Sequence, residues 1–593
     1  MATAMRQFVL LTAVSSLVFL TNLGVPQLWD EDEPIFAGAA QEMLERGEWI
    51  VPYFNGQMLP DKPVLTYWVM LAAYKTLGVN EWAARLGPAL FAWGGVLLVW
   101  QLGRKLFSPA VGVWAGVILA TSLGFDVVAR AATPDTLLSF FSTLALLAFA
   151  FGATPPSGAP LSRMPGWLAF AASYAAMGFA VLAKGPIGCL LPTATTGLFL
   201  LIANAPRPAG EGPASAAGDS WKSRFGAAFS FFRRSFAPGH FLKTIWSLRP
   251  LTAIAAIAAV AGPWYSAVGA KTGGQWLTGF LGVHNLGRFL HPMEHHRGPI
   301  FYYLIAIAIG FFPWSLFAAP VLGQLKARLA AREDRRLGHL FLACWAAVYL
   351  GFFSLAATKL PNYIVPAYPA LALLAAVWIE AWLSQPHAAS LARKLRPAWI
   401  TLGLVGVGVV VGLPLAARYF LDANWALGLA GIPLIAAAAA CWRFSERGES
   451  RKAAIAFGAA AVAFPLSLFG GAAVAVGRHQ TSARFAELVH RHATGEAPAI
   501  RACGYYRPSL VFYAREPVRQ LVEDEQVCRF FREHEQNAFL FTTGERYERF
   551  AAQLPADVCV LDRQRWFLRS NQVLLLGRPH SLARSKSPSE TVP

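Results

Sequence analysis

Long apolar runs separated by short polar loops make up most of the chain. A helix that crosses a bilayer needs about 17–25 predominantly apolar residues, so each such run is a candidate membrane span. The pattern predicts thirteen spans, at about 7–24, 83–103, 108–125, 135–152, 165–183, 187–204, 250–270, 300–322, 339–358, 361–383, 398–418, 425–443 and 453–477. The first run is long for the apolar part of a signal peptide, and no small-residue cleavage site follows it, so we expect it to remain as a span.

One shorter apolar segment decides the topology. Residues 64–78 are rich in Tyr and Trp, which is typical of a helix lying along the membrane surface. If this helix does not cross and Met1 begins in the cytoplasm, every strongly basic loop falls on the cytoplasmic side, as the positive-inside rule requires. Those loops contain Arg104 and Lys105, Arg163, and residues 205–249, 326–336, 392–397 and 443–452. The loop 29–82 and the chain beyond the last span then lie on the opposite side.

The region after the last span has a different pattern. Strand-like and helical stretches alternate within 478–580, which predicts a small α/β domain. Residues 581–593 have the composition of a disordered tail. We therefore expect a membrane domain over 1–477, an α/β domain over 478–580 and a tail.

The composition is that of a membrane protein. Of the 593 residues, 55% are hydrophobic and 14% are charged, which is more apolar than a soluble domain. The net charge of +18 comes from Lys and Arg that lie mostly in short loops, and no basic domain stands apart from the spans, so we expect no nucleic-acid partner. The cysteines of the C-terminal region, Cys503, Cys528 and Cys559, lack CxxC spacing; they allow one disulfide at most and exclude a metal finger.

Ionisable and aromatic residues collect in the loops on the non-cytoplasmic side. Such residues at span ends on one face form a functional-site hypothesis. Carboxylates, cations and aromatics from five separate loops fit a groove that handles an anionic lipid-linked substrate. The segments are DEDEP (30–34) with PDKP (60–63), RAATPD (130–135), AKGP (183–186), 283–303 and 358–369.

These residues also fit ordinary structural roles. The acids fit helix caps, the lysines fit partners of neighbouring acids or interfacial anchors, and the histidines fit solvated loop residues. The residues open to this interpretation are Asp32, Glu33, Asp135, Lys62, His284, His291, His295, His296, Lys359 and Tyr363. Four consecutive acids exceed what one helix cap uses, which favours a functional carboxylate within DEDEP.

The order of the motifs resembles a known family. The stretches WDEDEPIFAGAAQEMLERGEWIVPYFNGQMLPDKPVLTYW, WAARLGPAL, RAATPDTLLSFF, AKGPIG, HRGPIFYY and TKLPNYIVPAYPALALL are similar to bacterial members of the dolichyl-phosphate-mannose protein mannosyltransferase superfamily, and within it to lipid A 4-amino-4-deoxy-L-arabinose transferases. The resemblance covers nearly the whole chain. It implies an α-helical polytopic membrane protein with the C-type glycosyltransferase fold and a periplasmic α/β domain. It also implies an undecaprenyl-phosphate-linked sugar donor, no nucleotide sugar, and an active site at the periplasmic face of the bacterial inner membrane.

The resemblance also implies roles for single residues. By motif position, Asp32 resembles the catalytic aspartate, Lys62 the donor-phosphate lysine and Asp135 the second acidic residue. Position in the same loops adds further candidates. We predict Asp32, Glu33 and Asp135 as catalytic residues, Lys62, Arg130, Arg288, Lys359 and Tyr363 as ligands of the donor phosphate, and Asp61 and His296 as ligands of a divalent metal ion if one is bound.

The chain departs from the family pattern in two places. The family commonly has Glu-Lys-Pro where this chain has Asp61-Lys62-Pro63, and often Arg-Tyr where this chain has Ile35-Phe36. The missing arginine bears on the identity of the sugar and the acceptor more than on the class of reaction.

We therefore expect a glycosyltransferase that moves a sugar from a polyprenyl-phosphate donor to lipid A. Fixed cations, Lys62 first, would stabilise the leaving phosphate. Asp32 would take the proton of a hydroxyl acceptor or, with a phosphate acceptor, position it or stabilise the oxocarbenium-like sugar; the sequence leaves both roles open. The same reaction on protein hydroxyls or on another envelope glycolipid is the alternative. A transporter of lipid-linked sugars fits less well, because the span interiors carry almost no ionisable residues and no repeat is visible.

Overall fold

The computed structural model describes most of the chain. The described residues are 2–155, 161–206, 221–292, 296–331, 335–384, 389–420, 424–494 and 497–579. The predicted tail over 581–593 and His295 lie outside them.

All thirteen predicted apolar segments are helical, and ten of them are long and apolar enough to span a membrane. These are α1 (Ala2–Leu20), α4 (Glu81–Leu106), α7 (Asp135–Ala153), α8 (Trp167–Lys184), α12 (Pro250–Lys271), α17 (Arg336–Leu355), η3 with α18 (Pro361–Ala367, Tyr368–Leu383), α19 (Ala389–Phe420), η4 with α20 (Trp425–Gly431, Ile432–Glu446) and the continuous run of α21, η5 and α22 (Ser450–Ser467, Leu468–Ala472, Ala473–Gly477). The chain is a polytopic membrane protein, as predicted.

The other three segments are bent or short. Helices α5 (Pro109–Ala120) and α6 (Leu123–Ala129) meet at 66°. Helix α15 (Tyr302–Gly310) meets the continuous run of η2 (Trp314–Phe317) and α16 (Ala318–Ala330) at 115°. Helix α9 (Ile187–Ala203) is apolar but only 17 residues long. Counted by length, the described residues therefore give ten spans, or twelve if each bent pair crosses once.

Local sequence signals explain where the helices begin. The Asn80 side chain accepts a hydrogen bond of 2.9 Å from the Ala83 N–H and caps α4. Ser108 caps α5 in the same way, with Pro109 as its first helical residue. A polar side-chain oxygen at this position satisfies a backbone donor that the helix leaves open.

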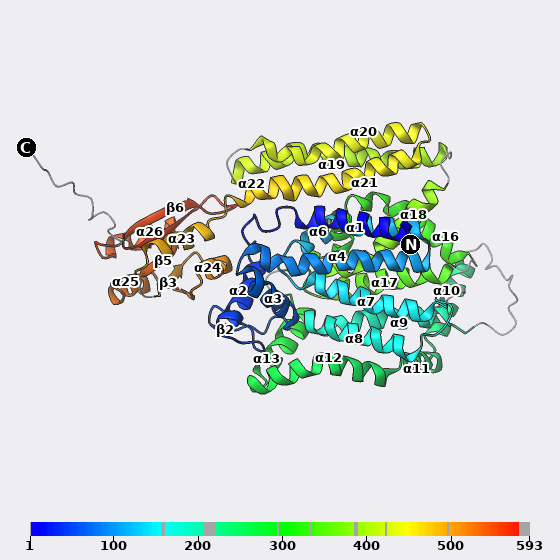
Figure 1. The fold of residues 1–593 in the computed structure, drawn as a ribbon, viewed down its shortest axis with the longest axis horizontal. Helices are drawn as coiled ribbons and strands as arrows, with labels where there is room; N and C mark the ends of the chain where they lie inside the picture. The colour runs from blue at the N-terminus through cyan, green and yellow to red at the C-terminus, as the bar shows by residue number, and fades with distance from the viewer. Residues whose placement is uncertain are drawn as a thin grey trace, which may run out of the picture.

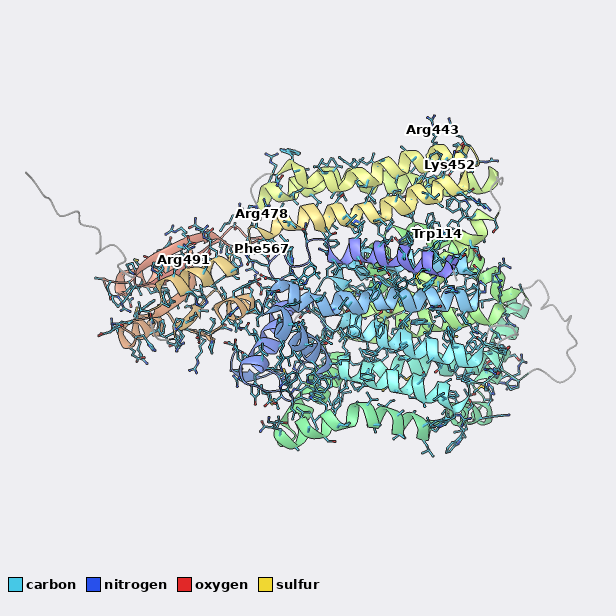
Figure 2. The ribbon with its side chains drawn as sticks, viewed as in Figure 1. Trp114, Arg443, Lys452, Arg478, Arg491 and Phe567 are labelled. Carbon is cyan, nitrogen blue, oxygen red and sulfur yellow. The ribbon has the colours of Figure 1, made fainter. Side chains whose placement is uncertain are left out.

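The 64–78 segment forms a short helix outside the set of spans. Helix α3 (Leu65–Leu77) has 13 residues and packs beside α2 (Asp32–Glu45). Figure 1 shows both at the end of the bundle that carries the C-terminal domain, which we call the domain end, and shows the N-terminus at the opposite end. Arg443 and Lys452, from a predicted cytoplasmic loop, also lie at the opposite end (Figure 2).

The C-terminal region is a five-stranded mixed sheet with four helices, which agrees with the predicted small α/β domain. The strand order is β4-β3-β5-β7-β6, with β3 parallel to β4 and β5, and β7 antiparallel to β5 and β6. Strand β5 is buried along its whole length because it is central and covered on both faces. The elements are β3 (Ala499–Cys503), β4 (Val518–Gln520), β5 (Ala538–Thr543), β6 (Cys559–Arg565), β7 (Gln572–Gly577), α23 (Ser482–His492), α24 (Pro508–Ala514), α25 (Asp524–Glu533) and α26 (Gly544–Phe550), with a 3-10 turn η6 (Ala551–Gln553). Cys503, Cys528 and Cys559 are free thiols.

Short elements complete the described chain. A small hairpin of β1 (Tyr53–Phe54) and β2 (Gln57–Met58) lies between α2 and α3 in sequence. Helices α10 (Trp221–Ser235) and α11 (Pro238–Ser247) precede α12. After α12 come α13 (Gln275–Leu277), the π-helix η1 (Thr278–Gly287) and α14 (Arg288–Leu290).

Candidate active site

A cavity of about 490 Å³ opens at the domain end of the bundle, and we call it the polar cavity. Residues from the first loop, the start of α7, the end of α8, α14 and η3 meet there, so loops far apart in sequence converge as expected. Its lining comprises Glu31, Asp32, Phe36, Asp61, Lys62, Pro134, Asp135, Lys184, Arg288, His296, Leu360, Asn362 and Tyr363. Seven of the ten predicted site residues belong to this lining.

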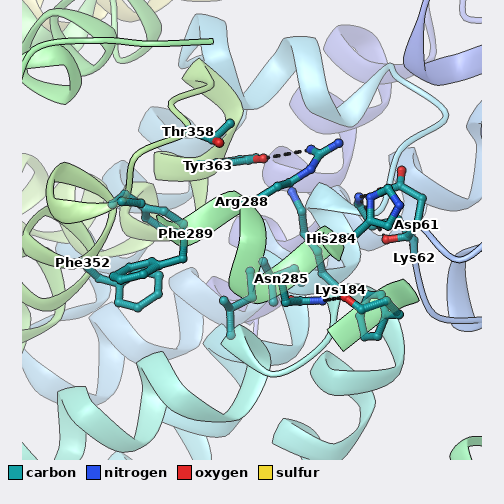
Figure 3. A pocket seen from close by; sticks show the side chains of 15 residues that line it. Asp61, Lys62, Lys184, His284, Asn285, Arg288, Phe289, Phe352, Thr358 and Tyr363 are labelled. Atoms are coloured by element: carbon teal, nitrogen blue, oxygen red, sulfur yellow. Dashed lines mark hydrogen bonds and ion pairs between the residues drawn. The ribbon is translucent and has the colours of Figure 1, made fainter. Parts of the chain in front are cut away.

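One wall of the polar cavity is cationic. Lys62 Nζ lies 2.7 Å from Asp61 Oδ1, and His284 Nδ1 lies 3.1 Å from the same oxygen. Arg288 donates a hydrogen bond of 3.3 Å to the Tyr363 hydroxyl (Figure 3). Burial raises the pKa of Asp61, but the Lys62 charge and the His284 contact outweigh it and hold that pKa below its ordinary value. The wall therefore keeps one carboxylate ionised among several donors.

Asp32 and Asp135 form the acidic side of the cavity. Asp32 lies in the first turn of α2, and its side chain is exposed to solvent. Burial raises the pKa of Asp32, the Lys62 charge lowers it, and the charges of Asp135 and Asp61 raise it again, so the net direction is upward. A carboxylate with a raised pKa that faces a cavity is the kind of group that takes a proton during a reaction.

Asp135 lies deeper in the cavity and is paired. Its carboxylate forms a buried ion pair with Lys184 and accepts a hydrogen bond of 3.2 Å from the Asn362 side-chain amide. Lys184 also lies over the Tyr363 ring, 5.1 Å from the ring centre. The Asp135 carboxylate therefore binds one side chain from α8 and one from η3. Asp135 is the first residue of α7, and Pro134 occupies the N-cap position.

Glu33 takes a different position from Asp32. It forms a buried ion pair with Arg85 at 2.7 Å and accepts hydrogen bonds from the N–H groups of Trp29 and Ala132 at 2.8 and 2.7 Å. Glu33 is absent from the described lining of the polar cavity. The structure thus places it as an anchor between the first loop, α4 and the loop before α7.

Arg130 and Lys359 are also placed away from the polar cavity. Arg130 donates to the carbonyls of Val18, Phe19 and Thr21 and so satisfies the C-terminal end of α1. Lys359 donates in the same way to three carbonyls at the end of α17, those of Phe353, Ser354 and Ala356. Neither residue is part of the cavity lining in the described chain, and the donors of both are used on helix ends.

The sequence prediction missed three residues that the structure brings to the others. His284 contacts Asp61, while Lys184 and Asn362 contact Asp135. Two of these residues carry a signal in the sequence. Lys184 belongs to the AKGP motif on the predicted non-cytoplasmic side, and His284 belongs to a histidine-rich stretch. Asn362 carries no signal in sequence beyond its place beside Tyr363.

The predicted metal ligands do not form a metal site by themselves. The acid Asp61 contacts His284, and His296 lines the cavity elsewhere. Among the described residues no group of three or more His, Cys, Asp or Glu side chains is arranged to hold a metal ion.

Two further cavities adjoin the polar cavity. A groove of about 680 Å³, which we call the apolar groove, lies along α6, α15 and η3 and shares Asp32, Asp135 and Asn362 with the polar cavity. A smaller pocket of about 100 Å³, the lateral pocket, shares Lys62, Lys184, Arg288 and Tyr363 with it and adds the rings of Phe280, Phe289, Phe352 and Phe353 (Figure 3). The acidic side therefore borders one apolar space and the cationic wall borders another.

Comparison with solved structures defines the class of fold. The crystal structure of ArnT from Cupriavidus metallidurans bound to undecaprenyl phosphate matches with a TM-score of 0.70 and 21% identity, over 96% of this chain and 97% of that one. The chain therefore has the C-type glycosyltransferase fold of that protein, as the resemblance implied.

Sequence comparison finds a family model and several relatives. Residues 61–210 match the family model for dolichyl-phosphate-mannose-protein mannosyltransferase. An undecaprenyl phosphate-alpha-4-amino-4-deoxy-L-arabinose arabinosyl transferase of Edwardsiella ictaluri is 28% identical over 76% of this chain and 70% of its own length. One of the same name from Erwinia tasmaniensis is 26% identical over 63% of this chain, and the match spans only 59% of that relative.

Proposed function

We propose that the protein is a glycosyltransferase that moves a sugar from a polyprenyl-phosphate donor to lipid A at the periplasmic face of the bacterial inner membrane. The observation that supports this most is the polar cavity, which Lys62 and Arg288 of the cationic wall line together with the Asp32 carboxylate. Relatives named as undecaprenyl-phosphate sugar transferases support the donor class.

The cationic wall suits the leaving group. When the bond between the sugar and the lipid phosphate breaks, negative charge grows on the phosphate oxygens, and fixed donors stabilise that charge. Lys62 and Arg288 supply cations, and the Tyr363 hydroxyl adds a third polar group on the same wall. The aromatic lateral pocket beside them is an apolar space for the first part of the polyprenyl chain.

The acidic side suits the acceptor. Asp32 and Asp135 lie where the polar cavity and the apolar groove share a wall, so an amphiphile in the groove would bring its head group to Asp32. For a hydroxyl acceptor, the raised pKa fits Asp32 as a general base. For a phosphate acceptor, Asp32 would position the acceptor or stabilise the developing sugar cation.

The apolar groove favours an amphiphilic acceptor over a protein side chain. Its lining includes Val127, Ile305, Ile309 and Tyr368, and Val127, Ile305 and Ile309 are also exposed on the surface of the bundle. A groove that opens between apolar helices admits a lipid from the side. Another envelope glycolipid would use the same groove and remains the alternative acceptor.

Binding of undecaprenyl phosphate, the product that every such donor shares, tests the donor site without knowledge of the sugar. We expect Lys62→Ala to weaken binding about 10- to 100-fold, the usual range for loss of one charged hydrogen bond. The matched control is Lys75→Ala, whose ammonium lies over the Trp49 ring outside the polar cavity. Equal affinity in wild type and Lys62→Ala would contradict the donor site.

A further inference from the structure

The four acids of DEDEP divide their contacts among different parts of the molecule. Asp32 faces the polar cavity, and Glu33 is held by Arg85 of the bundle. Asp30 and Glu31 contact the C-terminal domain, and Glu31 also lines the polar cavity. The segment that carries the candidate catalytic acid is therefore held from both sides.

Asp30 makes the most complete of these contacts. One carboxylate oxygen accepts the Ser509 backbone N–H at 2.9 Å, and the other accepts the Ser509 hydroxyl at 2.6 Å. Ser509 is buried, and its hydroxyl also lies 2.8 Å from that of Ser482. Burial raises the pKa of Asp30, and the two bonds from Ser509 lower it, so this contact offsets part of the cost of enclosing the acid.

Neighbouring contacts join the same two parts of the chain. The Tyr513 hydroxyl accepts the Leu28 N–H at 2.8 Å and donates to Glu81 at 2.9 Å. Asn55 and the backbone of Val518 exchange two hydrogen bonds, of 2.9 and 2.8 Å. The domain thus docks on the first loop through several bonds, and those of Asp30 and Glu31 lie within two residues of Asp32.

We propose that Asp30 and Ser509 are positioning residues, through which the C-terminal domain holds Asp32 in its place in the polar cavity. Catalytic groups must be held within about 0.5 Å of a productive position, which takes support on each side. On one side, Glu33 ties the segment to Arg85 of the bundle. On the other side, Asp30 ties it to Ser509 of the C-terminal domain. This inference rests on the proposed function, and it makes the C-terminal domain part of the transfer machinery.

Ser509→Ala tests the proposal in the full-length protein, since it removes the hydroxyl bond and leaves the backbone bond. Ser509→Thr keeps a hydroxyl and serves as the conservative rescue. Ser570→Ala is the matched control, because the exposed Ser570 hydroxyl bonds only within its own turn, to Asn571, in the described chain. The readouts are sugar transfer to lipid A, affinity for undecaprenyl phosphate, thermal midpoint, and hydrogen exchange of the amides over residues 28–36.

We expect Ser509→Ala to lower transfer at least tenfold and to speed exchange over 28–36, with undecaprenyl phosphate affinity unchanged and a small drop in the thermal midpoint from the lost buried hydroxyl. Ser509→Thr should restore most of the transfer. Wild-type exchange over 28–36 in Ser509→Ala would overturn the positioning role, whether or not transfer is detected. Wild-type transfer in that variant would also overturn it. Absence of transfer in the wild type, with faster exchange in Ser509→Ala, would instead count against the proposed function alone.

Discussion

At the scale of single residues, the neighbouring acids of DEDEP contact different parts of the molecule. Asp32 and Lys62, both marked by motifs, line the polar cavity. Arg130 and Lys359 were predicted as phosphate ligands, but their donors are used on the ends of α1 and α17. A sequence shows that a cation lies near a span end, and it does not show which backbone carbonyls come within its reach.

The pH dependence of transfer follows from the position of Asp32. Burial raises the pKa of Asp32 above its ordinary 3.8, with further help from Asp135 and Asp61 against the lowering by Lys62. If the ionised form acts, transfer is full above the raised pKa and falls as the pH drops through it. We therefore expect activity to decline on acidification at a higher pH than an ordinary aspartate would give. A rate profile of detergent-solubilised protein checks this, and a decline centred below pH 3.8 would contradict it.

At the scale of elements, the sequence located the helices well and their bends poorly. All thirteen apolar segments are helical, yet the segment predicted as one span over 300–322 turns by 115° between α15 and η2. Pro313 lies at this break, and a proline in an apolar run is a sequence signal for a helix break. The size of the turn depends on packing against α6 and η3, which a run of apolar residues does not reveal.

Arg130→Met tests whether this residue serves a helix end or the donor. The variant keeps a long side chain and loses the bonds to the last carbonyls of α1. We expect a lower thermal midpoint and unchanged affinity for undecaprenyl phosphate, the reverse of Lys62→Ala. A tenfold loss of affinity with an unchanged midpoint would place Arg130 at the donor instead.

The Glu33–Arg85 pair joins α2 to α4 and predicts a stability effect. Both side chains are buried, and Arg85 also donates to the carbonyls of Leu23, Pro26 and Gln27. Glu33→Gln leaves the Arg85 charge without its buried partner, a change that costs about 3–5 kcal/mol. Thermal unfolding would show a clear drop in the midpoint, whereas the same change at exposed Glu487, paired with Arg491, should leave it unaltered.

At the scale of the whole molecule, the start of α1 and the C-terminal domain lie at opposite ends of the bundle, which agrees with the topology predicted from the basic loops (Figure 1). Exposed Cys559 in the C-terminal domain offers a natural test, because the other described cysteines are buried or half-buried. We expect a membrane-impermeant maleimide to label intact spheroplasts at Cys559, with Cys559→Ser as the control. Labelling only after the membrane is opened would invert the topology.

The active-site reaction is tested most directly by a mass spectrum of lipid A. The cells compared would lack the protein, carry the wild type, or carry Asp32→Asn, with equal amounts of protein in the membrane. We expect a sugar-sized mass on lipid A with the wild type and its loss both in the deletion and with Asp32→Asn. The same lipid A spectrum in all three would contradict transfer to lipid A. A sugar-bearing peak that persists with Asp32→Asn would contradict the role of Asp32.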